Sequence, residues 1–151
     1  MSSENEQLVG RMFNELWSQG DFAMAEELFA AGYINHDPAT PDYGKGPEAE
    51  KSIVRFYRKA FPDLLFTIDH MIEAGDFVTT RFTAQGTHRN EFWGVPPTNK
   101  VVKVEGTVVI RASKGRIAER WVMWDALGLL QQLGAVPGWR PGSHGGAGET
   151  A

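Results

Sequence analysis

The sequence contains no cysteine. The chain can therefore form no disulfide, has no thiol nucleophile and cannot build a cysteine-ligated zinc or iron–sulfur site. Its histidines are few, and no two of them share the i, i+2 or i, i+4 spacing of a common metal site. We therefore expect no bound metal.

Long apolar runs and an excess of one charge are also missing. No stretch approaches the length of a membrane span, and the first six residues are acidic and polar, unlike a secretory signal. The net charge is −4, and the 15 lysines and arginines are scattered along the chain. These features predict a cytoplasmic protein that binds neither nucleic acid nor a membrane.

The length of 151 residues suits one domain with a sizeable core. We place this domain at residues 1–136. Residues 137–151 contain two prolines and five glycines, which predicts a loosely attached C-terminal tail.

Helical patterns come first and strand patterns follow. Apolar residues recur at helical spacing over 8–16 and 22–29, with a break at Gly20-Asp21, and a third helix is expected from Pro47 to just before Pro62. A short edge strand is expected over 33–37. From Leu64 onward the apolar period is two, which predicts strands near 64–72, 77–88, 101–112 and 117–125. The order indicates an α+β fold with helices on one side of an antiparallel sheet. In the first of these strands His70 falls in the apolar register, so we expect it to be buried.

The last strand pattern ends at a lone carboxylate, Asp125. Strand alternation divides the segment into two faces, with Ile117, Glu119, Trp121, Met123 and Asp125 on one and Ala118, Arg120, Val122 and Trp124 on the other. A carboxyl group among indole and thioether surface loses hydration, which favours its neutral form and acid/base use. Alternatively, Asp125 is only the N-cap of a helix that is closed by Gly134. For a catalytic Asp125 we expect Asp125→Asn to keep the fold and abolish turnover.

Three further polar residues each allow two interpretations. His88, at a strand end, could donate to an enolate oxygen opposite Asp125, or it could be a core histidine. His36 could line the pocket or stabilise a turn. Glu105 could be a second carboxylate near Asp125 or a surface charge at a dimer interface.

Several aromatic residues offer flat surfaces to a ligand, although core packing would also explain them. The candidates for substrate binding are His36, Phe82, Phe92, Trp93, Trp121 and Trp124. The glycines form no phosphate-binding pattern, so we expect no nucleotide.

A set of short motifs, in this order, spans most of the chain. They are Asn35-His36-Asp37-Pro38, Phe61-Pro62-Asp63, Gly86-Thr87-His88 with Glu91-Phe92 and Gly94, Pro96-Pro97-Thr98, Gly115-Arg116-Ile117-Ala118-Glu119 with Trp121, and Asp125 with residues 127–134. With them the chain resembles the SnoaL-like polyketide cyclases, or ester cyclases, of the nuclear transport factor two-like superfamily. This resemblance implies a cone-shaped α+β fold in which N-terminal helices pack on a curved antiparallel sheet around an apolar cavity.

The resemblance also implies a function. Cyclases of this family use one aspartate at the strand-to-helix junction for the intramolecular aldol closure of an aromatic polyketide ester, without a cofactor, and Asp125 matches that position. It further implies an apolar or aromatic substrate and a homodimer formed through the outer face of the sheet. Asn90 and Asn99 depart from the family pattern, Asn90 near the pocket mouth and Asn99 in a turn. A non-catalytic ligand-binding module, or an enzyme for epoxide opening or dehydration, stays open as an alternative.

Overall fold

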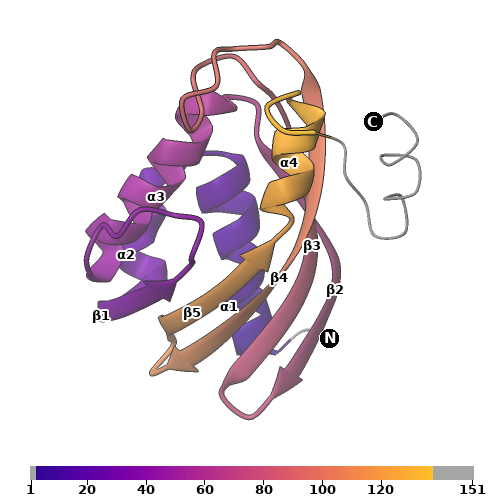
Figure 1. Cartoon of the computed structure of the whole chain (residues 1–151). Coiled ribbons are helices and arrows are strands. Elements are labelled where there is room, and N and C mark those ends of the chain that lie inside the picture. The colour runs from indigo at the N-terminus through magenta and orange to yellow at the C-terminus, as the bar shows by residue number, and fades with distance from the viewer. Residues whose placement is uncertain (1–2, 138–151) are drawn as a thin grey trace.

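The computed structural model describes residues 3–137, so the predicted tail lies, apart from Pro137, outside the described residues. The predicted order of helices before strands is confirmed. The elements are α1 (Glu4–Arg11), the π-helical η1 (Met12–Ser18), the 3₁₀ turn η2 (Phe22–Met24), α2 (Ala25–Leu28), β1 (Phe29–His36), α3 (Gly46–Ala60), β2 (Leu65–Ala74), β3 (Phe77–Thr87), β4 (Val101–Ser113), β5 (Arg116–Trp124) and α4 (Ala126–Gln132). Figure 1 shows this arrangement.

The five strands form one open sheet in the order β1-β5-β4-β3-β2. Strands β2 to β5 are the predicted antiparallel meander. The edge strand β1 begins at Phe29 rather than Tyr33, and it pairs in parallel with β5. The sheet is therefore mixed, and not purely antiparallel as predicted. The cause is topological: β1 pairs with β5, the last strand of residues 3–137, after α3 and the rest of the meander have intervened.

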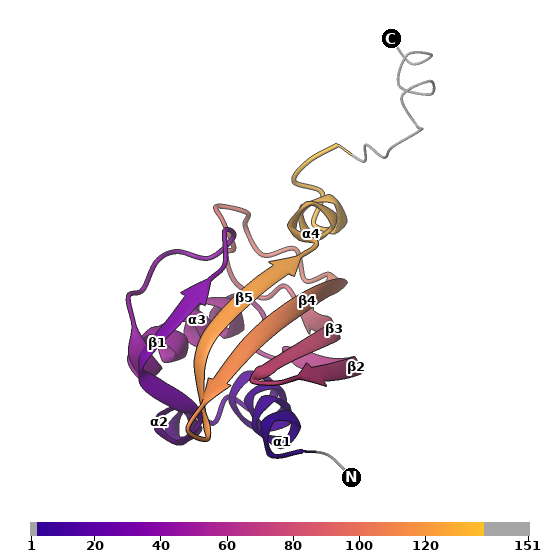
Figure 2. The same ribbon diagram turned by 90° about the horizontal axis from the view of Figure 1, so that it is seen from below.

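The helices cover one face of the sheet, which bends round α1 and α3 (Figure 2). The helix α1 begins at an N-cap, Ser3, whose Oγ accepts from the Glu6 N–H at 3.1 Å, and α3 begins with Pro47 in its first turn. Apolar side chains of α1, η1 and α3 share one core with the inner face of the sheet. This core includes Leu8, Met12, Phe13, Leu16, Ile53, Val54, Val78, Phe82, Val108 and Ile110. This packing fixes the concave face on which the site is built.

The pairing of β2 differs from the prediction at His70. Its pairing with β3 shifts register between Ile68 and His70. Because side chains alternate along a strand, one irregularity reverses the faces of all later residues. Beyond it Met71 is partly buried, whereas His70 and Ile72 are exposed. The expected burial of His70 is wrong for this reason.

Candidate active site

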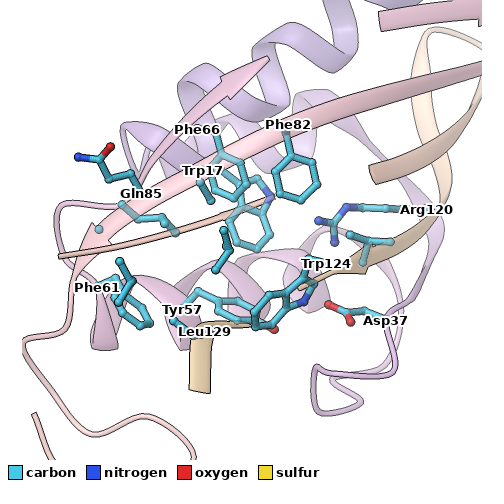
Figure 3. A pocket seen from close by; sticks show the side chains of 16 residues that line it. Trp17, Asp37, Tyr57, Phe61, Phe66, Phe82, Gln85, Arg120, Trp124 and Leu129 are labelled. Atoms are coloured by element: carbon cyan, nitrogen blue, oxygen red, sulfur yellow. The ribbon is translucent and has the colours of Figure 1, made fainter. Parts of the chain in front are cut away.

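A cavity lies between the helices and the concave face of the sheet, at the end where β5 runs into α4. It holds about 580 Å³ of empty space, part of it open to solvent. Figure 3 shows the lining residues: Trp17, Asp37, Tyr57, Phe61, Leu64, Phe66, Phe82, Ala84, Gln85, Gly86, Val102, Val104, Arg120, Val122, Trp124 and Leu129. The lining is mostly apolar, with few polar side chains, as is typical of a small-molecule site.

Strand alternation builds the cavity wall. Arg120, Val122 and Trp124 are every second residue of β5, and they point inward together. Neighbouring strands add their own inward residues, such as Phe82 and Ala84 from β3. The predicted alternation is correct from Glu119 to Trp124, but the inner face is the one that carries Arg120 rather than the one that carries Asp125. Ile117, predicted on the face of Asp125, is instead buried in the core, because the pairing of β5 with β4 shifts register between Ile117 and Glu119.

Asp37 directly follows β1 and lines one end of the cavity (Figure 3). Its carboxylate accepts from the Ala39 N–H at 2.9 Å and from the Thr40 hydroxyl. The Thr40 Oγ1 in turn lies 2.7 Å from the hydroxyl of Tyr57. Burial, followed by the charge of Asp37, raises the pKa of Tyr57, so its phenol stays protonated at neutral pH. A carboxylate hydrogen-bonded through a hydroxyl to a neutral phenol can accept and return a proton.

Arg120 lies at the same end of the cavity and is 3% exposed. One terminal nitrogen donates to Asn35 Oδ1 at 2.9 Å, and the guanidinium carbon lies 5.3 Å from the centre of the Trp17 ring. Its Nε has no hydrogen-bond partner among the described residues. Burial alone would lower the pKa of Arg120, but Glu50, Tyr33, Asp37 and Tyr57 together outweigh this effect and the pKa is raised. The guanidinium is therefore a fixed cation beside Asp37.

Glu50 supplies the balancing charge behind the cavity wall. It is fully buried, and its carboxylate accepts from Trp17 Nε1 at 3.0 Å and from the Tyr33 hydroxyl at 2.8 Å. Burial and the charge of Glu50 raise the pKa of Tyr33, which keeps its hydroxyl a donor. Buried charges are costly unless an opposite charge and hydrogen bonds compensate them. Glu50 has two hydrogen bonds and the nearby positive charge of Arg120, whereas Arg120 keeps one donor without a partner.

The structure places Asp125 at the N-terminus of α4, exposed to solvent. Its carboxylate accepts from the Gly128 N–H at 2.8 Å, so the N-cap interpretation is confirmed. Asp125 is not among the lining residues, and Met123, on its predicted face, is 69% exposed. This position does not test the predicted catalytic role of Asp125, which stays a prediction.

His88 is fully buried and does not line the cavity. Its Nδ1 accepts from the Thr98 N–H at 3.2 Å and lies 3.1 Å from the Thr98 hydroxyl, while its ring packs 5.5 Å from that of Phe61. These contacts support a core histidine, and a catalytic role stays a prediction. Glu105 is exposed and pairs with Arg81 at 3.4 Å, as the surface-charge interpretation expects.

His36 and Trp121 lie on the outer face of the sheet. The His36 Nε2 is 2.7 Å from Glu119 Oε2, and its ring stacks on Trp121 at 5.2 Å. Both residues line a second hollow, outside the cavity, which also includes Asp37 and Met123. Neither residue reaches the inner cavity, and the predicted homodimer through this face stays a prediction.

The other aromatic candidates lie in or beside the cavity. Phe82 and Trp124 line it. Phe92 is buried 5.5 Å from Phe61, and Trp93, which is 37% exposed, stacks on Trp124 at 5.8 Å. Trp93 and Phe92 thus support the wall from the loop that follows β3.

Sequence reasoning missed Asp37, Tyr57 and Arg120 as site residues. The available signal was Arg120, a charged residue in phase with Val122 in a strand that is apolar on both faces. A charged residue normally marks the solvent face, so the pattern concealed which face is internal. Asp37 follows β1, and only the three-dimensional pairing of β1 with β5 brings it to Arg120.

Residues 3–137 contain no cluster of three or more histidine, aspartate or glutamate side chains suited to a metal. No helix among them is long and apolar enough to cross a membrane.

Comparison with known proteins gives consistent results. The model of the SnoaL-like polyketide cyclase family matches residues 7–133. The nogalonic acid methyl ester cyclase of Streptomyces nogalater is 30% identical over 123 residues, which cover 77% of this chain and 90% of that protein. The crystal structure of a candidate polyketide cyclase from Acidithiobacillus ferrooxidans has a TM-score of 0.82 and 30% identity, and covers 91% of this chain and 99% of its own. IdmH from Streptomyces antibioticus, another candidate polyketide cyclase, has a TM-score of 0.76 and 30% identity, with 87% and 99% covered.

Proposed function

Because the chain belongs to the SnoaL-like polyketide cyclase family, we propose that it closes a ring in an apolar carbonyl compound, with Asp37 as the acid/base. One observation carries this proposal: among the described residues that line the cavity, Asp37 is the only carboxylate. The substrate class follows from the apolar lining and from the S. nogalater relative, which is named as a cyclase of a methyl ester. The activity needs no cofactor, because proton transfer and C–C bond formation only rearrange electrons already in the substrate.

The proposed reaction is an intramolecular aldol closure. The Asp37 carboxylate removes a proton from the carbon next to a carbonyl, and the C–H electron pair becomes the C=C bond of an enolate. The enolate carbon then attacks a second carbonyl of the same molecule, which forms the C–C bond and an alkoxide. Asp37 returns its proton to that alkoxide, so the product is an isomer of the substrate and the carboxylate is regenerated.

The cavity wall supports this step in two ways. Its aromatic and aliphatic side chains hold a folded substrate with the reacting carbons together, and such orientation accounts for much of the rate of intramolecular reactions. The hydrogen bonds from Ala39 and Thr40 fix the direction of the Asp37 carboxylate. The Tyr57 phenol, linked through Thr40, can stabilise the protonation change without entering the reaction.

The test compares Asp37→Asn with Asp125→Asn on a panel of aromatic polyketide esters. We expect Asp37→Asn to lower turnover by about 10²-fold or more, the usual contribution of a positioned acid/base. We expect Asp125→Asn to keep turnover near wild type, since asparagine also caps helices well. Product mass and the thermal unfolding midpoint are measured for each protein.

The matched pair separates the competing interpretations. Loss of turnover in Asp125→Asn alone would restore the sequence-based assignment and reject Asp37. Ligand-induced stabilisation of all three proteins with no product from any of them would indicate a binding module. Product with added water would indicate epoxide opening instead of ring closure.

A further inference from the structure

We infer that Arg120 binds the reacting carbonyl oxygen, and that this end of the cavity takes a neutral carbonyl and stabilises its enolate. The inference rests on the proposed role of Asp37. It assigns a second residue to the reaction and restricts the substrate to compounds without a carboxylate at the reacting end.

The first argument is an unmet hydrogen bond. Arg120 is almost fully buried, and its Nε donor has no partner among the described residues. A buried donor without an acceptor is unfavourable, and such groups in native structures commonly serve a functional site. Because Arg120 also lines the cavity, an oxygen atom of a ligand there can complete its hydrogen bonding.

The second argument is the position of Arg120 relative to Asp37. Both line the same end of the cavity and come from adjacent strands. Asp37 directly follows the end of β1, and Arg120 lies in the middle of β5, where its partner in β1 is Asn35. Figure 3 shows the guanidinium directed among the lining rings, with the Asp37 carboxylate beside it. A base and a cationic donor at one end of an apolar cavity match the two atoms that change during enolisation, the C–H proton and the carbonyl oxygen.

The third argument is the balance of charge. Arg120 contributes one positive charge, and Glu50 and Asp37 each carry a carboxylate near it. A ligand carboxylate would meet two negative groups and one positive group, and like charges repel strongly in a weakly polar site. A neutral carbonyl avoids this repulsion. When Asp37 accepts the proton, the negative charge moves to the oxygen at Arg120, so the total charge of the site does not change.

The alternative is that Arg120 only balances Glu50 and stabilises the fold. A binding experiment separates the two roles without using activity. The probe is 2-naphthol, a flat aromatic molecule whose ionised form has its own absorption band and resembles an enolate. Its neutral control is 2-methoxynaphthalene, which has the same rings but cannot ionise.

The measurement is the pKa of bound 2-naphthol, followed by absorbance, in proteins that carry Asp37→Asn. This substitution imitates the protonated acid and removes one negative charge. We expect the pKa of bound 2-naphthol to fall by about one pH unit or more relative to the wild-type complex. Adding Arg120→Gln should abolish this decrease, while 2-methoxynaphthalene still binds. Adding Arg81→Gln, on the outer face of the sheet, to the Asp37→Asn protein should leave the pKa of bound 2-naphthol unchanged.

The outcomes distinguish this inference from the proposed function. An equal decrease in the pKa of bound 2-naphthol with and without Arg120→Gln would overturn the role of Arg120 and leave the role of Asp37 in place. The same pKa in wild type and in Asp37→Asn would show that Asp37 does not face the bound oxygen, which overturns the roles of both residues. Failure of both probes to bind wild type would also overturn both.

Folding needs its own control, because Arg120→Gln leaves the Glu50 carboxylate buried without its cation. If that variant unfolds, the comparison is repeated with Glu50→Gln in both proteins, which removes the unpaired charge. The pKa of bound 2-naphthol should again be lower in the protein that keeps Arg120 than in the protein that carries Arg120→Gln. An unchanged value in this pair would equally overturn the inference.

Discussion

Burial determines what individual charged residues do in this protein. Arg120 and Glu50 are enclosed, each has hydrogen bonds to other side chains, and their opposite charges interact. Asp125 and Glu105 are exposed, and their contacts are a helix cap and a surface ion pair. Surface ion pairs contribute little to stability, whereas buried charges are strongly destabilising when one partner is removed. The chemically useful charges are therefore those that the fold has enclosed.

Asp63 gives a prediction for pH dependence. Its carboxylate accepts from the Thr87 N–H and from the Thr87 hydroxyl, both at 2.7 Å. Partial desolvation raises the pKa of Asp63, but the Thr87 hydrogen bonds outweigh it, and the pKa lies below its ordinary value of 3.8. A pKa that is lower in the folded state than in the unfolded state stabilises the folded protein at pH values above the unfolded-state pKa. This contribution is lost as the pH falls through the folded-state pKa.

We therefore expect Asp63→Asn to weaken the loss of stability in acid. The measurement is the urea midpoint at about pH 6 and about pH 3 for wild type and variant. The difference between the two midpoints should be smaller in the variant. An Asp42→Asn control, in an exposed loop, should match wild type. Equal pH dependence in wild type and Asp63→Asn would contradict the account.

At the scale of elements, the sequence predicted the existence of most helices and strands but not their irregularities. The strand period is local, so the meander was visible in the sequence. The register shift at Ile68 and the parallel pairing of β1 with β5 depend on contacts between distant segments. For the same reason the alternation of β5 from Glu119 to Trp124 could be predicted from the sequence, whereas the choice of inner face and the burial of Ile117 could not.

Gly106 in β4 shows how one element shapes the cavity. It pairs with Phe82 on one side and with Trp124 on the other. A Cβ at this position would meet the Phe82 ring, and would lie 2.8 Å from Trp124 Cβ and 2.9 Å from the Met123 carbonyl oxygen. The missing side chain therefore lets the two rings approach each other in the cavity wall.

We expect Gly106→Ala to lower the free energy of unfolding by about 1–3 kcal/mol, the usual cost of overpacking. Displacement of the two rings should also weaken binding of 2-methoxynaphthalene. Urea unfolding and a binding titration measure the two effects. Gly32→Ala in β1 is the matched control, because a Cβ there meets nothing within 4 Å. A Gly106→Ala protein as stable as the control would show that the wall can relax.

At the scale of the whole molecule, the curved sheet leaves space that the helices do not fill. The shared core packs against one part of the concave face, and another part of this face lines the apolar cavity. The α+β class was predicted from the order of helical and strand patterns and the cavity from the family resemblance, while composition alone indicated only one globular domain. Protein interiors are otherwise densely packed, so a cavity of this kind has a stability cost that a ligand can offset.

Substitutions at two alanines distinguish the cavity from the packed core. Ala84 and Ala112 are both buried in the sheet, but only Ala84 lines the cavity. We expect Ala84→Leu to fill empty space, to change the free energy of unfolding by less than about 1.5 kcal/mol and to weaken 2-methoxynaphthalene binding. Ala112→Leu should instead overpack the core, at a cost of about 1–3 kcal/mol, and leave the affinity of the folded protein unchanged. Urea unfolding and binding titrations test both variants. Equal destabilisation by the two would mean that the cavity is closed in solution, and the site would then need a conformational opening before any ligand could reach Asp37.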